Sequence, residues 1–148
     1  MSNSTLYEQA FYAWAQEQAA PLRSGRFFEA DFANIAEEIE SMGKSEKREL
    51  VNRLALLLAR LLKCQFQPTF RGNRWLFSIE EQRARLADHL ADNPSLKAAL
   101  PDLITTAYRL ASIGAARATG LGRESFPRAC LWSFEQIKAD DFWPGIAE

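Results

Sequence analysis

Apolar residues recur every three or four positions along most of the chain, a spacing typical of amphipathic helices. No run alternates apolar and polar residues, and no Asn-Gly hairpin signal occurs, so strands are not expected. The pattern predicts helices over residues 5–20, 31–42, 45–66, 74–91, 94–119 and 133–138, with either a kink or the start of a new helix at Pro101. We therefore expect an all-α fold, an antiparallel helical bundle of five to six helices with an irregular aromatic C-terminal tail, in a single domain over residues 1–148.

Capping residues locate the starts of several helices. Thr5 with Glu8, and Ser133 with Gln136, match the capping box that begins a helix. Further candidate N-caps are Asp31, Ser45 and Asn73.

Proline and glycine mark the expected helix ends. Pro21 is expected to close the first helix, because proline cannot donate a helical hydrogen bond. Gly43 and Gly120 are expected to act as C-caps, since glycine readily adopts the left-handed conformation. Gly114 lies among small residues inside a helix, which predicts a close helix approach either within the bundle or across a homodimer.

The helix over residues 45–66 is predicted to be the central one, because apolar residues cover more than half of its circumference. Its core stripe consists of Leu50, Leu54, Leu57, Leu58, Leu61 and Leu62. Arg60 interrupts this apolar run, and a charge there must be paired, reach solvent or lie at an interface. We expect Arg60 to pair with Glu38 or Glu40, because the acidic and apolar helices are predicted to be antiparallel neighbours.

The acidic helix over residues 31–42 carries the most enzyme-like group of side chains. Its apolar stripe, expected to face the core, is formed by Phe32, Ile35, Ala36, Ile39 and Met42. Glu37 points away from this stripe, and Glu38 and Glu40 flank it about 160° apart at about 100° per residue. Carboxylates so spread cannot share a metal without ligands from other helices, and the one histidine is His89. The favoured interpretation is a solvated or salt-bridged helix flank; the alternative is a metal-dependent hydrolase.

The net charge of −1 hides an uneven distribution of charges along the chain. Residues 1–43 carry two basic and seven acidic side chains, net −5, whereas residues 44–85 carry ten basic and four acidic, net +6. Residues 86–148 carry six basic and eight acidic side chains, net −2. The whole chain therefore offers no surplus of charge for a nucleic acid or an acidic membrane, and its blocks can neutralise one another within the fold.

Aromatic and guanidinium groups alternate in the basic block, as they do in proteins that hold single-stranded nucleic acid. A nucleic-acid-associated accessory protein would use Lys63, Arg71, Arg74 and Trp75. The stronger interpretation is that these aromatic residues close one end of the bundle beneath arginine stems. Nucleic acid is therefore not the expected partner.

Composition excludes several other classes. Hydrophobic residues make up 47% and charged residues 25% of the 148, as in ordinary globular proteins. Cys64 and Cys130 share no zinc or redox spacing, so we expect reduced thiols and neither metal nor cofactor. The longest apolar stretch, residues 54–62, is nine residues, against about 20 for a membrane span. With no signal-peptide pattern, a cytoplasmic protein without membrane association is expected.

No nucleophile with an adjacent base, phosphate-binding glycine loop or metal-ligand spacing is found in the sequence. The sequence therefore argues against an enzyme, although it does not decide the question. It favours a helical-bundle protein that acts through protein–protein contacts, with either a protein partner or a second copy of itself. The nucleic-acid and hydrolase alternatives stay open.

Short segments spread along the chain together resemble the bacterial domain-of-unknown-function family number 29. They are residues 6–8, 11–14, 22–27, 35–43, 61–63, 67–68, 74–75, 78–83, 94–96 and 141–144. The resemblance implies an all-helical fold and no particular activity. The chain departs from the family pattern at Arg60, where a histidine is frequent. A role that needs an imidazole does not transfer to a guanidinium, which accepts neither a proton nor a metal.

Overall fold

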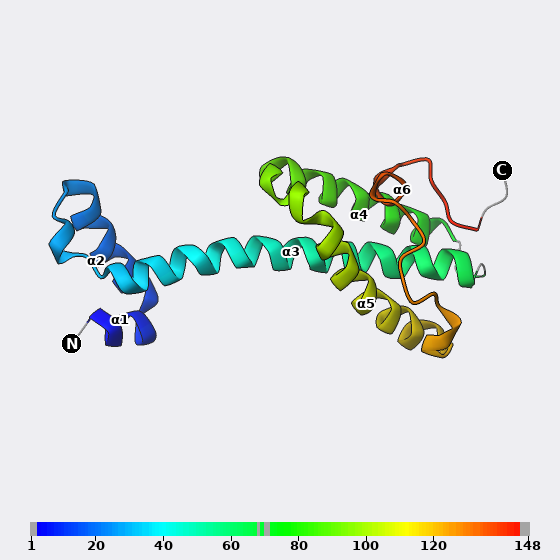
Figure 1. The fold of residues 1–148 in the computed structure, drawn as a ribbon, viewed down its shortest axis with the longest axis horizontal. Helices are drawn as coiled ribbons and strands as arrows, with labels where there is room; N and C mark the ends of the chain where they lie inside the picture. The colour runs from blue at the N-terminus through cyan, green and yellow to red at the C-terminus, as the bar shows by residue number, and fades with distance from the viewer. Residues whose placement is uncertain (1–2, 68, 70–71, 146–148) are drawn as a thin grey trace. The chain divides into compact units, whose positions relative to one another are not determined.

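The computed structural model describes residues 3–67, 69 and 72–145, and this part of the chain is helical without strands (Figure 1). In chain order the elements are α1 (Asn3–Gln9), α2 (Phe11–Ser24), η1 (Phe27–Glu29), α3 (Phe32–Phe66), α4 (Asn73–Asp92), η3 (Pro94–Ala99), α5 (Leu100–Thr119), η4 (Arg123–Ser125) and α6 (Phe134–Lys138). The all-α prediction is confirmed. No helix in the described ranges is long and apolar enough to cross a membrane.

The chain folds as two compact units, Met1–Ser45 and Glu46–Glu148, and the boundary between them falls inside α3. We call them the N-terminal unit and the C-terminal unit and describe each by itself. The single domain expected over residues 1–148 stays a prediction.

Helix α3 continues through the point where the sequence predicts a break. Gly43 and Ser45 lie inside this helix of 35 residues, so the predicted C-cap and N-cap there are wrong. Strong helix formers follow the glycine: Lys44, Glu46, Lys47 and Arg48. A single glycine costs a helix only about 1 kcal/mol, which such neighbours can offset. The two segments are parts of one helix, so the antiparallel arrangement assumed for an ion pair of Arg60 with Glu38 or Glu40 is also wrong.

The continuity of α3 predicts that Gly43→Ala stabilises the protein. A Cβ at Gly43 would meet no atom within 4 Å, and alanine in a helix gains about 0.5 to 1 kcal/mol over glycine. Gly25→Ala is the matched control, because Gly25 has a φ of 78° and alanine there should cost about 1 to 2 kcal/mol. Urea denaturation followed by circular dichroism measures both. A loss of stability in Gly43→Ala would instead indicate a C-cap at this glycine.

The N-terminal unit consists of α1, α2, η1 and the first part of α3. The expected first helix is divided at Ala10, and Pro21 does not end it, because α2 continues for three more residues to a left-handed C-cap at Gly25. Asp31 caps α3 as predicted: its Oδ1 accepts from the Asn34 backbone N–H at 3.5 Å. The predicted capping box at Thr5 lies outside the side chains that the structure describes.

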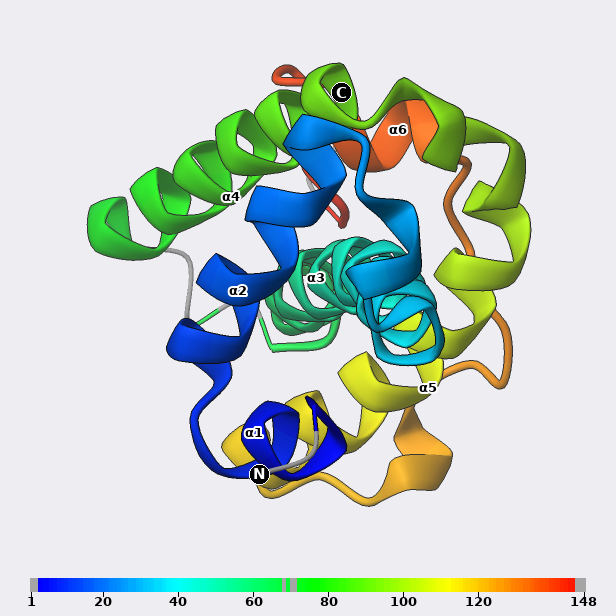
Figure 2. The same ribbon diagram turned by 90° about the vertical axis from the view of Figure 1, so that its left-hand side faces the viewer.

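The C-terminal unit is built around the leucine-rich part of α3. Figures 1 and 2 show α4 and α5 on different sides of this part of the helix. The six leucines predicted as its core stripe are all fully buried. They form one apolar cluster with residues that include Ile79, Leu86, Ala107, Ala111 and Ala115. The prediction of a central, covered leucine helix is therefore confirmed for this unit.

Some of the helix ends predicted for the C-terminal unit are confirmed and others are wrong. Ser133 and Gln136 form the predicted capping box, and Gly120 is a left-handed C-cap with a φ of 77°. Asn73 is not the N-cap of α4, because the helix already begins there after Gly72. A Cβ at Gly114 would meet nothing within 4 Å, so the close approach expected within the bundle is absent from the described residues.

The aromatic tail is held by a buried arginine of α4. Arg83 donates from Nε to the Ile137 carbonyl oxygen at 2.9 Å and from Nη2 to the Phe142 carbonyl oxygen at 2.8 Å. Its guanidinium carbon also lies 5.2 Å from the ring centroid of Trp143. From α3, the Cys64 thiol donates to the Pro144 carbonyl oxygen at 3.2 Å. The tail is therefore irregular, as predicted, but attached to the core by polar contacts.

Candidate functional site

The acidic side chains of the N-terminal unit are distributed between structural contacts and solvent. Tyr7 donates its hydroxyl to Glu38 Oε2 at 2.9 Å, which joins α1 to α3. This hydrogen bond, followed by burial, raises the pKa of the Tyr7 hydroxyl. Glu37 and Glu40 are exposed. Glu38 therefore has a structural partner, while its two neighbours are free to meet solvent or another molecule.

Asp31 joins α2 to the start of α3. Its Oδ2 accepts from Asn34 Nδ2 at 2.8 Å and from Trp14 Nε1 at 3.2 Å, and its backbone N–H donates to Gln18 Oε1 at 2.6 Å. The hydrogen bond from the Asn34 side chain is the main cause that lowers the pKa of the Asp31 carboxyl. These contacts join α2 to α3 within the N-terminal unit, so Asp31 has a structural role there.

The same unit exposes most of its large apolar side chains. We call them the N-terminal apolar surface: Phe11, Tyr12, Leu22, Phe27, Phe28, Phe32, Ile39 and Met42. Phe28 is 89% exposed, Ile39 64% and Met42 62%. The expectation that the stripe on residues 32–42 faces a core is therefore wrong for these side chains. A unit this short cannot build a core that covers all of its apolar residues.

The residues of the hydrolase alternative do not form a metal site. His89 Nε2 lies 3.0 Å from the Glu46 carbonyl oxygen and 3.7 Å from its Oε2, so a single neighbour accounts for its contacts. No group of three or more histidine, cysteine, aspartate or glutamate side chains is placed to hold a metal in the ranges described. The hydrolase alternative thus gains no support from the geometry.

The candidate nucleic-acid residues are only partly described, because Arg71 lies outside the described residues. Arg74 is exposed at the start of α4, whereas Trp75 is half-buried against the core. Lys63 is also half-buried, and burial, with a smaller effect of the nearby Arg60 charge, lowers its pKa. Arg60 has a buried Nε without a hydrogen-bond partner among the described residues. The half-buried Trp75 agrees with an aromatic group that closes the bundle end.

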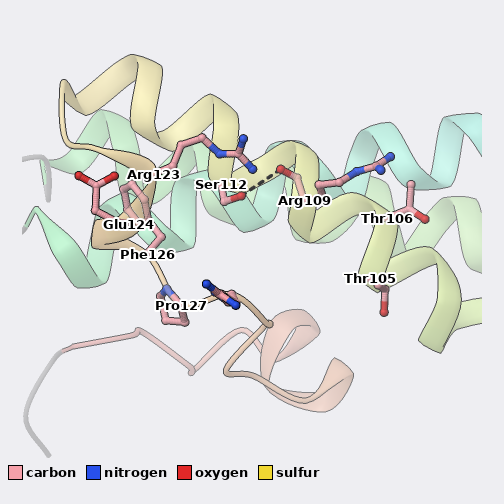
Figure 3. Close-up of a pocket in the computed structure, with 9 residues that line it drawn as sticks. Thr105, Thr106, Arg109, Ser112, Arg123, Glu124, Phe126 and Pro127 are labelled. Atoms are coloured by element: carbon pink, nitrogen blue, oxygen red, sulfur yellow. Dashed lines mark hydrogen bonds between the residues drawn. The ribbon is translucent and has the colours of Figure 1, made fainter.

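A cavity of about 900 Å³ in the C-terminal unit was not expected from the sequence (Figure 3). Its lining consists of Thr105, Thr106, Arg109, Ser112, Arg123, Glu124, Phe126, Pro127 and Arg128. The three arginines come from α5, from η4 and from the segment after η4. All three are exposed, and no ion pair joins them to a carboxylate in the part of the chain that the structure describes. We call this site the arginine cavity.

Buried contacts fix the segment that carries two of these arginines. The Phe126 ring packs edge-on against Phe66 with 5.5 Å between centroids, and Tyr108 donates its hydroxyl to the Pro127 carbonyl oxygen at 2.6 Å. Burial raises the pKa of the Tyr108 hydroxyl, which keeps it protonated as a donor. Arg123 and Arg128 are thus attached to a segment that is anchored between them.

Sequence reasoning missed the arginine cavity because its arginines are spread over 20 positions. Only the reversal of the chain after Gly120 returns residues 123–128 to the side of α5. The one local signal is a pair of arginines around a Phe-Pro dipeptide, and this pattern is too common to identify a site.

Comparison with known proteins assigns the chain to a family. The family model described as "Domain of unknown function DUF29" matches residues 6–143, nearly the whole chain, as the resemblance of the short segments predicts. No curated protein and no solved structure matches the chain.

Proposed function

We propose, from the premise that this chain belongs to the DUF29 family, that it is a non-catalytic bacterial protein whose N-terminal apolar surface binds a basic amphipathic helix of a partner protein. The observation that carries the proposal is the exposure of Phe28, Ile39 and Met42 on a short folded unit. Contiguous exposed apolar patches on soluble proteins commonly mark interaction sites.

The spacing of the apolar side chains on α3 suits a helical partner. Phe32, Ile35, Ile39 and Met42 follow one another at intervals of three, four and three residues. This spacing places them along one stripe of a helix, and such stripes pair with the apolar face of a second helix. The exposed rings of Phe27 and Phe28 in η1 lie only a few residues before this stripe in the sequence.

Charge selects a basic partner over a second copy of the same surface. Residues 1–45 carry three basic and seven acidic side chains, net −4. Glu40 is exposed at one flank of the apolar stripe of α3, and Glu37 is exposed on the face of the helix opposite the stripe. Two such surfaces facing each other would bring like charges together, whereas lysines or arginines beside an apolar stripe would complement them. Cys64 and Cys130 are thiols rather than halves of a disulfide, which is in keeping with binding in the cytoplasm.

Binding of two synthetic helical peptides to the full chain tests the proposal. Both peptides have about 20 residues, roughly 30 Å of helix, and the same leucine stripe, but one has lysine flanks and the other glutamate flanks. Fluorescence anisotropy at low salt is expected to detect binding of the lysine peptide only, and the affinity should fall as salt is added. Ile39→Asp should weaken the affinity for the lysine peptide at least tenfold, about 1.4 kcal/mol, because a charge replaces an apolar contact that the bound peptide would bury.

Phe77→Asp is the matched control, because Phe77 is 67% exposed on the C-terminal unit and outside the surface. It should change the affinity by less than twofold. Equal binding of both peptides, or equal loss in both variants, would contradict the proposal. Sedimentation velocity tests whether a second copy of the chain binds to this surface instead. A dimer that dissociates in Ile39→Asp would contradict the partner helix and assign the surface to self-association.

A further inference from the structure

We infer that the arginine cavity binds an organic polyanion, a small molecule that carries two or more phosphoryl or carboxylate groups. This site shares no residue with the N-terminal apolar surface, so it adds a second binding activity to the one proposed above. The inference rests on the size of the cavity, the charge of its lining and the anchoring of the segment that forms one wall.

The size of the cavity suits a small molecule. Its volume of about 900 Å³ lies within the range of about 300 to 1,000 Å³ that is usual for ligand pockets. Phe126 and Pro127 contribute apolar surface, while Thr105, Thr106 and Ser112 contribute hydroxyl groups. The three hydroxyls donate to carbonyl oxygens of their own helix, at 3.0 to 3.2 Å. A ligand therefore meets mainly the arginines as hydrogen-bond donors.

The charge of the lining favours anions. The lining contains three arginines and one carboxylate, Glu124, and the described residues supply no ion pair for any of the arginines. In Figure 3 the Arg123 guanidinium extends toward Ser112, and the Glu124 carboxylate lies on the other side, away from it. A guanidinium binds phosphoryl and carboxylate oxygens through two parallel hydrogen bonds. Arginines from three separate segments therefore match a ligand with more than one anionic group.

The wall between Arg123 and Arg128 is already in place without a ligand. Phe126 is buried against Phe66, and the Pro127 carbonyl accepts from Tyr108 in the adjacent helix. A preorganised wall spares a ligand the cost of ordering a loop, so more of the contact energy appears as affinity. A ligand must still order the exposed arginine side chains of this wall.

Isothermal titration of the full chain with pyrophosphate, citrate and inorganic phosphate at low salt tests the inference. Pyrophosphate or citrate is expected to bind at one site per chain, and at least tenfold more tightly than inorganic phosphate. Arg109→Ala and Arg123→Ala should each weaken this binding at least tenfold. Arg109→Lys should fall between the wild type and Arg109→Ala, because lysine keeps the charge but loses the paired hydrogen bonds.

Arg117→Ala is the matched control, because it removes one positive charge as the other variants do. Arg117 is exposed on the same helix, α5, and does not line the cavity. It should alter the affinity by less than twofold, and circular dichroism of each variant verifies that it is folded. An equal loss in Arg117→Ala would assign the binding to net charge rather than to this cavity. No heat of binding for any of the three anions, or no preference for the polyanions, would overturn the inference. Neither result would affect peptide binding at the N-terminal apolar surface.

Discussion

Arg83→Ala is expected to lower the free energy of unfolding by about 3 kcal/mol, the range of a broken buried polar network. Arg83 is 3% exposed, and its loss leaves the carbonyl oxygens of Ile137 and Phe142 without their donor. It also removes the cation that lies against the Trp143 ring. Burial lowers the pKa of this guanidinium, although Asp140 and Asp141 oppose the effect, so the charge is retained near neutral pH.

Arg85→Ala, two positions along the same helix, is the control for this substitution. Arg85 forms an ion pair with Glu81 at 2.9 Å in which both side chains are more than half exposed. Such exposed pairs contribute about 0.5 kcal/mol or less. Chemical denaturation of both variants, followed by circular dichroism, gives the two values. Similar losses in the two variants would mean that Arg83 does not hold the tail in solution.

Leu57→Ala is expected to destabilise the C-terminal unit by about 3 to 5 kcal/mol, through lost burial and the cavity it leaves. Leu57 is fully buried in the centre of the leucine stripe. Leu56→Ala changes the adjacent residue of α3, which is 41% exposed, and should cost less than about 1 kcal/mol. Urea denaturation curves of both variants measure the difference. A cost at Leu56 equal to that at Leu57 would show that another surface covers this side of the helix in solution.

Local patterns predicted much of the helical structure correctly because they depend on residues only a few positions apart. The Ser133 capping box, the Asp31 N-cap and the Gly120 C-cap were all identified from such neighbours, and each is present. The break predicted at Gly43 failed because the preference of one glycine is weaker than the helix propensity of the residues around it. The end predicted at Pro21 is also wrong, since α2 continues to Ser24 despite the hydrogen bond that the proline nitrogen cannot donate.

The candidate sites were harder to predict. An apolar stripe on a helix has the same periodicity whether a core or a partner molecule covers it, so the pattern of residues 32–42 could not distinguish Ile39 from a core residue. The role of Arg83 was not expected from the sequence, because its carbonyl partners are more than 50 positions away. In both cases the property that matters is set by residues distant in the sequence.

The sequence alone determined that the chain is all-helical, that the six leucines of the predicted stripe form a core and that the chain resembles its family, because periodicity and composition express these properties directly. The tertiary structure decided which apolar faces remain exposed, how Arg83 holds the tail and that Arg109, Arg123 and Arg128 line one cavity. Burial and charge clustering depend on how distant segments pack, and short-range sequence preferences do not encode that packing.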